Sequence, residues 1–253
     1  MKKFVWNFVV ALFIPVFFFA VILPNRSRKY FIWGSAPLIN NKYWSNALKE
    51  HGFPSITLMQ HYQQINKKDD FDFYVTDFAP RFLPRLVRMG LGTCLALLFT
   101  LRRAKVIHMS FNGFLLGNTI FWKLESFLFR IGGVKVIVIP FGADAYMYSK
   151  VIDPSLRYGL LANYPNYSKL ENKVESFVKY WMKHADIIIP GPMIDGMGRW
   201  DVTTNQIFAI DIKSWKSKIE YSENNGVTGS VKIIHTPNHT DFKGTEFLID
   251  AVA

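Results

Sequence analysis

The chain has 253 residues, enough for one large domain or two small ones, and its 30 Lys and Arg against 19 Asp and Glu give a net charge of +11. A basic balance suits nucleic acid, anionic lipid or phosphorylated substrates. Nucleic acid is not an expected partner, because the chain has no RGG tract, zinc-finger spacing or RNP-like aromatic strand. The 23 Phe and 7 Trp indicate membrane contact instead. A single cysteine, Cys94, excludes a disulfide framework, and its apolar surroundings predict a buried structural thiol.

The amino-terminal segment is strongly apolar. Residues 4–23 carry no charge, and a helix of that length, at about 1.5 Å per residue, reaches across a hydrocarbon core of roughly 30 Å. We therefore expect residues 1–29 to contain a membrane anchor or an interfacial helix, and a buried first helix of the domain is the alternative. Basic residues both precede and follow the segment, so the positive-inside rule does not fix its orientation.

Short apolar runs then alternate with helical patterns. Strand patterns cover residues 30–33, 55–59, 71–75, 105–109, 134–139 and 186–189, and helical patterns cover residues 40–51, 81–104, 119–131 and 170–184. Strands that alternate with helices predict a parallel sheet with right-handed crossovers. We therefore expect residues 30–212 to form an α/β, Rossmann-like domain with residues 134–139 as its central strand.

The carboxyl-terminal part has a different organisation. Residues 213–230 are polar and glycine-containing, which predicts a linker between domains. Residues 231–253 have the pattern of a strand, a loop and the beginning of a helix, and the chain stops at Ala253 inside that helical pattern. One strand and two helical turns cannot bury a core, so we expect a second α/β domain that is incomplete here. The alternative is that this tail docks on the domain before it.

Arginines flank a second apolar run, residues 89–101, which is too short to span a bilayer. One interpretation is a core helix with solvated ends. The other is an interfacial helix whose guanidinium groups meet lipid phosphates. The candidate membrane-binding residues of this second interpretation are Arg81, Arg85, Arg88, Arg102 and Arg103.

The loops that follow the expected strands are where open α/β sheets bind ligands. Gly34 and Ser35 follow the first strand, and a glycine lets the backbone approach a phosphate closely. Asn112 lies in the loop after residues 105–109. Gly142 and Asp144 follow the strand at residues 134–139, and Asp144 is expected to be either an exposed carboxylate in a cleft or a capping group.

Lys243 is the most informative single residue of the tail. It precedes Gly244 and a helical pattern, and a cation at a helix amino end is unfavourable unless it shares an anionic ligand with that helix. His235 and His239 are separated by Pro237, so they lack helical spacing and no metal site is expected. The chain has no serine-hydrolase elbow and no Walker loop, which excludes serine hydrolases and nucleoside triphosphatases. It also lacks Gly-x-Gly-x-x-Gly after the first strand, which argues against an NAD(P)-dependent enzyme.

The tail from residue 236 to residue 251 resembles the start of the donor domain of a bacterial family 4 glycosyltransferase of the GT-B fold. In that family a Lys-Gly pair precedes a helix that ends in an acidic residue and Ala. The segment Val106–Ser110 is similar to the family's His-containing strand end, Pro140–Asp144 to its His-Gly-Ser-Asp segment, and Gly34 to its first phosphate-facing glycine. The resemblance covers residues 30–253, but the Arg of the family's Gly-Arg pair has no match.

This resemblance implies two Rossmann-like domains, of which the amino-terminal one binds the acceptor and the carboxyl-terminal one binds a nucleotide-sugar. It also implies that transfer retains the anomeric configuration without a metal or cofactor, and that Lys243 holds the leaving diphosphate. We take Asp144 and Lys243 as the candidate catalytic residues. The candidate substrate-binding residues are Gly34, Ser35, Asn112, Gly142, His239 and Lys243.

The sequence thus predicts a membrane-associated glycosyltransferase at the cytoplasmic face of the inner or plasma membrane. Its expected partners are a nucleotide-sugar donor, a surface polysaccharide or lipid-linked acceptor, and the membrane itself. Because the donor motif and the ribose-binding residues of the family would lie beyond Ala253, we expect the 253-residue chain to be inactive by itself. The alternative is a non-catalytic, membrane-tethered α/β binding module.

Overall fold

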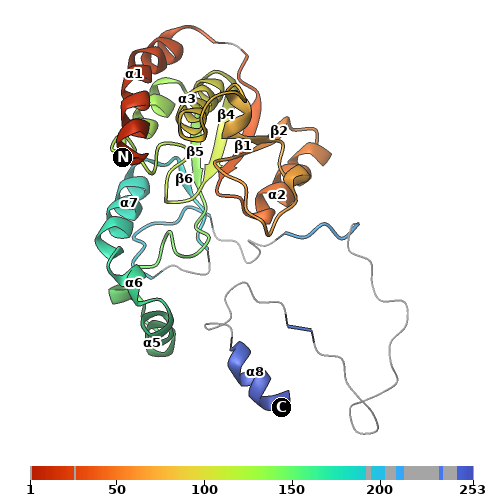
Figure 1. Cartoon of the computed structure of the whole chain (residues 1–253), viewed down its shortest axis with the longest axis vertical. Helices are drawn as coiled ribbons and strands as arrows, with labels where there is room; N and C mark the ends of the chain where they lie inside the picture. The colour runs from red at the N-terminus through yellow and green to blue at the C-terminus, as the bar shows by residue number, and fades with distance from the viewer. Residues whose placement is uncertain are drawn as a thin grey trace.

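The computed structural model describes residues 2–25, 27–191, 195–202, 209–213, 234–235 and 244–252. Within these residues, six strands form one parallel sheet with the order β3-β2-β1-β4-β5-β6 (Figure 1). The strands are β1 (Tyr30–Ser35), β2 (Ser55–Met59), β3 (Phe73–Tyr74), β4 (Ala104–Met109), β5 (Lys135–Val138) and β6 (Ile187–Ile188). This is the doubly wound order of Rossmann-like domains, so the expected α/β fold with a parallel sheet is confirmed.

One detail of the expected sheet is wrong. Residues 134–139 were expected to supply the central strand, but β5 lies between β4 and the two-residue β6, while β1 and β4 occupy the middle. The crossover through α3 (Arg85–Arg103) carries the chain from the far edge back to β4, beside β1. Burial alternates along β5, with Lys135 exposed and Val136 and Val138 buried, so its apolar pattern does not require a central position.

The remaining elements connect and cover the sheet. The other helices are α1 (Lys2–Ile22), α2 (Ile39–Glu50), α4 (Leu124–Ile131), α5 (Pro154–Asn163), α6 (Pro165–Ser168), α7 (Glu171–His184) and α8 (Thr245–Val252), and the 3-10 turns are η1 (Lys68–Asp70), η2 (Val75–Phe78) and η3 (Tyr148–Lys150). Figure 1 shows α2 on one side of the sheet and α1 with α3 on the other. The helix expected in the tail is α8, whereas most of the expected linker and the strand after it fall outside the described residues.

The main hydrophobic core lies between the sheet and the helices on the face that α3 covers. Ile32 of β1 and Ile107 of β4 are fully buried there, with Trp181 of α7. At Gly92 of α3, an added Cβ would lie 2.1 Å from the Val75 carbonyl oxygen, so only glycine permits this close approach of helix and loop. Cys94 is buried in the same core, and burial raises the pKa of its thiol to about 12, which confirms the expected structural thiol.

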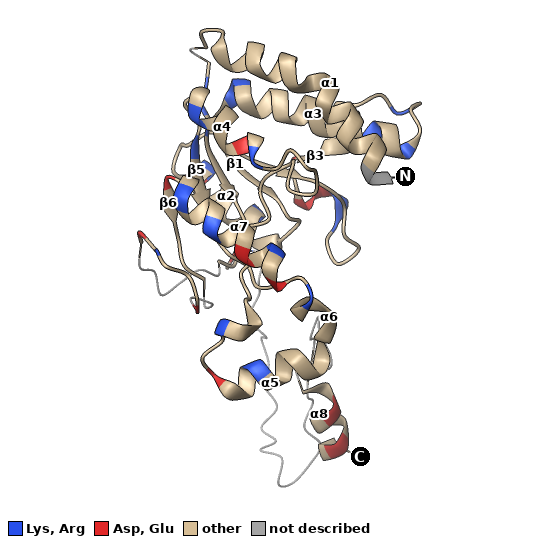
Figure 2. Ribbon diagram, turned by 90° about the vertical axis from the view of Figure 1, so that its left-hand side faces the viewer, with Lys and Arg blue, Asp and Glu red and all other residues tan. Residues whose placement is uncertain are grey.

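Helix α1 packs along α3 and α4 with one face and leaves the other face exposed (Figure 2). Val10 and Phe17 are fully buried, while Phe4, Phe8 and Phe19 are between 57% and 75% exposed. The Arg102 guanidinium donates to the carbonyl oxygens of Ala20 and Leu23, at 3.1 and 2.9 Å, and so ties the end of α1 to α3. By length and composition, α1 is the one helix of the described chain that could cross a membrane.

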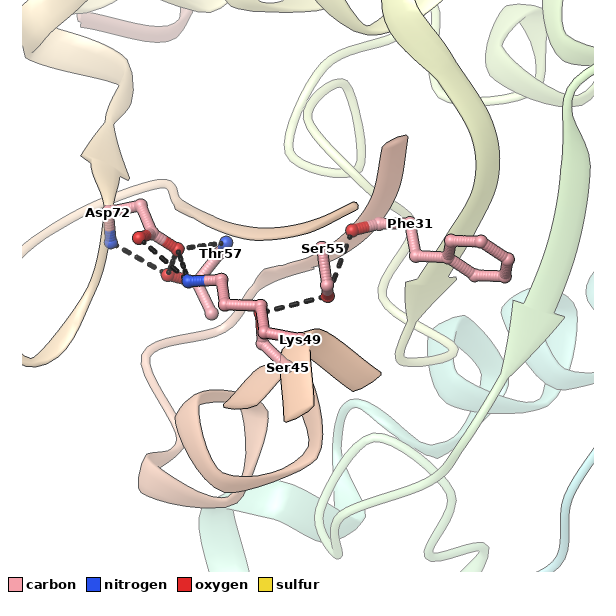
Figure 3. Close-up of polar contacts among 6 residues, drawn as sticks. All are labelled: Phe31, Ser45, Lys49, Ser55, Thr57 and Asp72. Atoms are coloured by element: carbon pink, nitrogen blue, oxygen red, sulfur yellow. Dashed lines mark hydrogen bonds and ion pairs between the residues drawn. The ribbon is translucent and has the colours of Figure 1, made fainter. Parts of the chain in front are cut away.

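A cluster of polar side chains links β2 to α2 and to the segment before β3 (Figure 3). The Asp72 carboxylate accepts from the backbone N–H and the hydroxyl of Thr57, at 2.8 and 2.9 Å, and also pairs with Lys49 of α2 at 3.1 Å. On the same helix, the buried hydroxyl of Ser45 lies 2.9 Å from that of Ser55. One carboxylate therefore joins β2, the start of β3 and α2, which fixes where β3 begins beside β2.

Candidate ligand site at the carboxyl edge of the sheet

A small hollow opens at the carboxyl ends of β1, β4 and β5. It is formed by Trp33 and Gly34 of β1, His108 of β4 and Pro140 after β5, with Trp44 of α2 on the rim. The strand order reverses between β1 and β4, and open α/β sheets bind ligands at this reversal. The hollow encloses only about 30 Å³, which is room for one or two groups the size of a water molecule. None of its lining side chains carries a formal charge at neutral pH.

Trp33 and His108 form the polar wall of the hollow. They are register partners on neighbouring strands, and their rings stack with centroids 3.6 Å apart and planes 7° apart. Both residues are more than nine-tenths buried, at 7% and 8% exposed. Trp33 Nε1 and His108 Nδ1 have no hydrogen-bond partner among the described residues. Buried polar atoms are normally paired, so these two unpaired nitrogens make the residues Trp33 and His108 candidates for contact with a ligand or a water molecule.

His108 is uncharged at physiological pH. Burial lowers the pKa of its imidazole to about 3, and a hydrogen bond with the Ile32 backbone opposes this shift only partly. The neutral ring carries one N–H and one lone pair, and its tautomer decides which of them Nδ1 presents. In either tautomer it suits a hydroxyl group, which can donate or accept, better than a phosphate.

Two buried carboxylates hold the loops around the hollow. Asp144 is 2% exposed and accepts from the backbone N–H groups of Phe111, Phe141 and Gly142, at 3.0, 3.0 and 2.9 Å. It therefore joins the loop after β4 to the loop after β5. Burial raises the pKa of the Asp144 carboxyl to about 6, although the three backbone bonds act in the opposite direction.

Glu125 has the same function within the segment that connects β4 to α4. It is fully buried at the start of α4 and accepts from the backbone N–H groups of Phe114, Leu115 and Leu116, at 2.9, 2.5 and 2.6 Å. Burial raises the pKa of its carboxyl to about 7. The loop it holds carries the Phe114 ring, which would lie 2.9 Å from a Cβ added at Gly34. Glu125 thus sets the position of the wall beside the hollow.

The structure corrects the expectation of an exposed carboxylate at Asp144. The residue is buried, its oxygens are used by the backbone, and it does not line the hollow. The alternative expectation, a helix cap, does not describe its contacts either, because no helix begins at Asp144 and its carboxylate accepts from the preceding residues Phe141 and Gly142 and from Phe111.

The other residues expected at this edge are only partly brought together. Gly34 lines the hollow, but its lack of a side chain is required by packing: an added Cβ would lie 2.3 Å from the Leu58 carbonyl oxygen. Ser35 is buried beside it, and its carbonyl oxygen accepts from Gln60 N–H at 2.9 Å. Asn112 is exposed on the loop after β4 and does not line the hollow, and Gly142 belongs to the loop that Asp144 holds.

The candidates in the tail cannot be placed. Lys243 and His239 lie outside the described residues, so their expected roles remain predictions. His235 is described, and its Nε2 lies 2.8 Å from the Thr245 hydroxyl. Within the described part of the chain, no group of three His, Cys, Asp or Glu side chains is arranged to hold a metal.

The candidate membrane-binding arginines have two kinds of environment. Arg88 donates to the Thr76 carbonyl oxygen through Nε and Nη2, at 3.0 and 2.8 Å, and Arg102 holds the end of α1. Arg81, Arg85 and Arg103 are exposed.

Sequence reasoning did not single out Trp33, Trp44 or Glu125. The one available signal was an acidic residue on the apolar face of the pattern Leu124–Ile131. No family model matches the chain, and no curated protein or solved structure matches it either.

Proposed function

We propose that residues 30–212 are the acceptor-binding half of a membrane-associated glycosyltransferase of the GT-B type. Such an enzyme moves a sugar from a nucleotide-sugar donor to a surface polysaccharide or a lipid-linked acceptor. The observation that carries the proposal is the hollow at the strand-order reversal, where Trp33 Nε1 and His108 Nδ1 are buried without a partner among the described residues. A hollow of about 30 Å³ accepts a hydroxyl or hydroxymethyl group. The body of the sugar then lies across the carboxyl edge of the sheet.

The chemistry of the hollow supports a neutral, hydroxylated ligand. A neutral His108 and the Trp33 N–H offer hydrogen bonds without charge, and Trp44 adds an apolar face beside Trp33, with ring centroids 5.2 Å apart. Ligand sites commonly combine aromatic walls with a few polar groups of fixed orientation. The sugar of an acceptor has this mixture of apolar C–H faces and hydroxyl edges.

The exposed face of α1 supports the membrane part of the proposal. Since the opposite face packs on α3 and α4, α1 serves best as a helix lying in the membrane interface, with Phe4, Phe8 and Phe19 toward the acyl chains. We place the protein at the cytoplasmic face of the membrane. The resemblance of the tail supports a retaining, metal-independent and cofactor-independent reaction with Lys243 at the leaving diphosphate.

A non-catalytic, membrane-tethered binding module is the second candidate. The observation in its favour is that Asp144, the candidate acid of the amino-terminal domain, is buried and bonded to backbone N–H groups. A carboxylate held in this way positions a loop and does not touch a ligand in the hollow.

Transfer by the complete protein tests the proposal. Membranes that contain it are incubated with labelled uridine, guanosine and thymidine diphosphate sugars, and incorporation into lipid and polysaccharide fractions is measured. We expect Lys243→Ala to reduce transfer by about 2–4 kcal/mol of transition-state stabilisation, and the charge-matched Lys232→Ala to leave it near wild type. His108→Phe is expected to weaken the use of acceptor. Sugar binding without transfer from any donor would favour the binding module, and wild-type turnover by Lys243→Ala would refute the role of that residue.

A further inference from the structure

A second and larger concavity lies on the same edge of the sheet, at the carboxyl ends of β2 and β3. We call it the cationic groove; it has a volume of about 690 Å³, and Lys68, Arg81, Arg85 and Arg88 lie along it. Gln60 of the groove is bonded to the strand that also borders the hollow, because its backbone N–H donates to Ser35 at the end of β1, and its side chain donates to Leu115 at 3.2 Å. The two concavities therefore lie beside each other on one edge of the sheet.

The described residues of the groove carry more positive than negative charge. Of its basic side chains, Arg88 is held by the Thr76 carbonyl oxygen, whereas Lys68, Arg81 and Arg85 form no ion pair with any described residue. Among the described residues, Asp77 is the one acidic residue along the groove, and its carboxylate accepts from the Tyr74 backbone N–H at 2.8 Å. A concave surface with this charge attracts an anion.

The start of α3 is a second and independent reason to expect an anion in the groove. Arg85 is the first residue of this 19-residue helix and Arg88 follows in its first turn, yet that turn has no acidic residue and no side-chain cap. Cations at the positive end of a helix dipole raise the energy of the free protein. An anion in the groove would neutralise both arginines and the helix end together.

The surroundings of the groove are apolar and exposed, which indicates where the anion comes from. Phe82 is 84% exposed, and Leu86 of α3 is 41% exposed. The two long helices run in the same direction, since Val9 faces Gly90 near their beginnings and Ala20 meets Arg102 near their ends. The amino-terminal ends of α1 and α3 therefore lie at the same end of the pair (Figure 2). Phe4 and Phe8, which are exposed, belong to that end of α1, and Arg85 of the groove begins α3. A soluble anion needs no such surface, whereas the chains of a lipid do.

We propose that the cationic groove binds the phosphate of a membrane lipid, with Lys68, Arg81 and Arg85 around the phosphate and the lipid chains against Phe82, Leu86 and α1. This inference rests on the proposed function in one respect only: it identifies this phospholipid as the acceptor, whose sugar then lies along the same sheet edge toward the hollow. The binding step itself requires no donor and no transfer.

Vesicle sedimentation of the protein tests the groove. The probes are phosphatidylcholine vesicles, the same vesicles with phosphatidic acid, and vesicles with enough oleic acid to give an equal surface charge without the added phosphomonoester. We expect the wild type to prefer the phosphatidic acid vesicles. The double variant Arg81→Gln/Arg85→Gln is expected to bind these vesicles with an affinity roughly tenfold lower. The charge-matched double variant Lys105→Gln/Lys183→Gln, with both changes on exposed residues outside the groove, is expected to bind like the wild type. Far-ultraviolet circular dichroism checks that all variants remain folded.

Each other outcome overturns the proposal in a recognisable way. Equal binding to oleic acid and phosphatidic acid vesicles would mean attraction to surface charge alone, and undiminished binding by the groove variant would place the phosphate elsewhere. Displacement by millimolar inorganic phosphate would assign the groove to a soluble anion. A failure of the proposed function gives a different result. If lipid binding depends on Arg81 and Arg85 but no sugar is transferred, the lipid-phosphate site stands and the glycosyltransferase proposal is refuted.

Discussion

The hollow and the cationic groove share one edge of the sheet but are built differently. The hollow is small and uncharged, and its walls are more than nine-tenths buried at Trp33 and His108. The groove is open, its arginines Arg81 and Arg85 are exposed, and it is about 690 Å³ in volume. Around the hollow, the same contacts that stabilise the domain also set the geometry of the site. Around the groove, the charged side chains extend from the surface and contribute little to the core.

This difference has a consequence for substitutions. A change near the hollow alters buried hydrogen bonds or packing, so it is expected to change the free energy of unfolding along with any binding. Removing an exposed basic side chain of the groove removes a solvated charge, so it is expected to change anion binding while the free energy of unfolding stays within about 0.5 kcal/mol. Stability measurements on matched pairs of variants therefore test whether the two regions are really different.

The largest expected effect is that of Glu125→Ala. The substitution leaves three buried backbone N–H groups without their acceptor, and each unsatisfied buried group costs about 1–3 kcal/mol. We expect the free energy of unfolding to fall by roughly 3 kcal/mol or more, measured by urea denaturation. The matched change in the groove is Asp77→Ala, which removes an exposed acceptor of the Tyr74 N–H and should cost about 1 kcal/mol. Similar losses for the two variants would contradict the comparison.

The next effect is that of Gly34→Ala at the wall of the hollow. The new Cβ would lie 2.3 Å from a backbone oxygen of Leu58, which cannot rotate away as a side chain can. We expect a loss of about 1–3 kcal/mol from overpacking, measured as a lower midpoint of denaturation. Gly198→Ala is the control, because nothing lies within 4 Å of its added Cβ. An unchanged midpoint for Gly34→Ala would show that β1 and β2 can separate there without cost.

The sequence predicted the sheet well because its signals are local. The run Ser55–Met59 is a strand with the bounds expected, and the helix expected at residues 170–184 is α7. Errors arose where a side chain or a proline overrode the pattern. The helix expected from Arg81 begins at Arg85, after Pro84, and the one expected from Thr119 begins at Leu124, because the Thr119 hydroxyl bonds the Leu116 carbonyl oxygen in a turn.

The candidate site was less accessible to sequence reasoning, because it depends on register and burial. The stacking of Trp33 on His108 follows from their pairing across β1 and β4, and no local pattern gives the register of a crossover connection that spans most of the sheet. The loop carrying Asp144 was located correctly after a strand, yet its carboxylate turns inward to three backbone N–H groups. Only the assembled loops supply those donors. The groove likewise joins Lys68 to Arg85, which are close in space through the fold of η1 and α3.

The smallest expected effect is on the pH dependence of stability. Here the buried carboxyl groups of Glu125 and Asp144, which hold the loops around the hollow, act against His108 in the wall of the hollow. The folded pKa values of Glu125 and Asp144 are raised to about 7 and about 6, so the folded state binds protons more tightly than the unfolded chain. Their contribution is complete below pH 4 and is lost as the pH rises through 6 to 7. The folded pKa of His108 is lowered to about 3, so its contribution is complete above pH 6.5 and is lost as the pH falls.

Between about pH 4.5 and 6 two falling carboxyl contributions oppose the single rising contribution of His108. We therefore expect the free energy of unfolding of the wild type to fall as the pH rises at about the rate of one group, on the order of 1 kcal/mol per pH unit. Glu125→Gln removes one falling contribution, and the stability of this variant relative to wild type should increase as the pH rises. His108→Asn removes the rising contribution and should show the reverse. Urea denaturation at several pH values measures both slopes. Parallel curves for the two variants and the wild type would mean that water reaches these groups, and the hollow would then be as open as the groove.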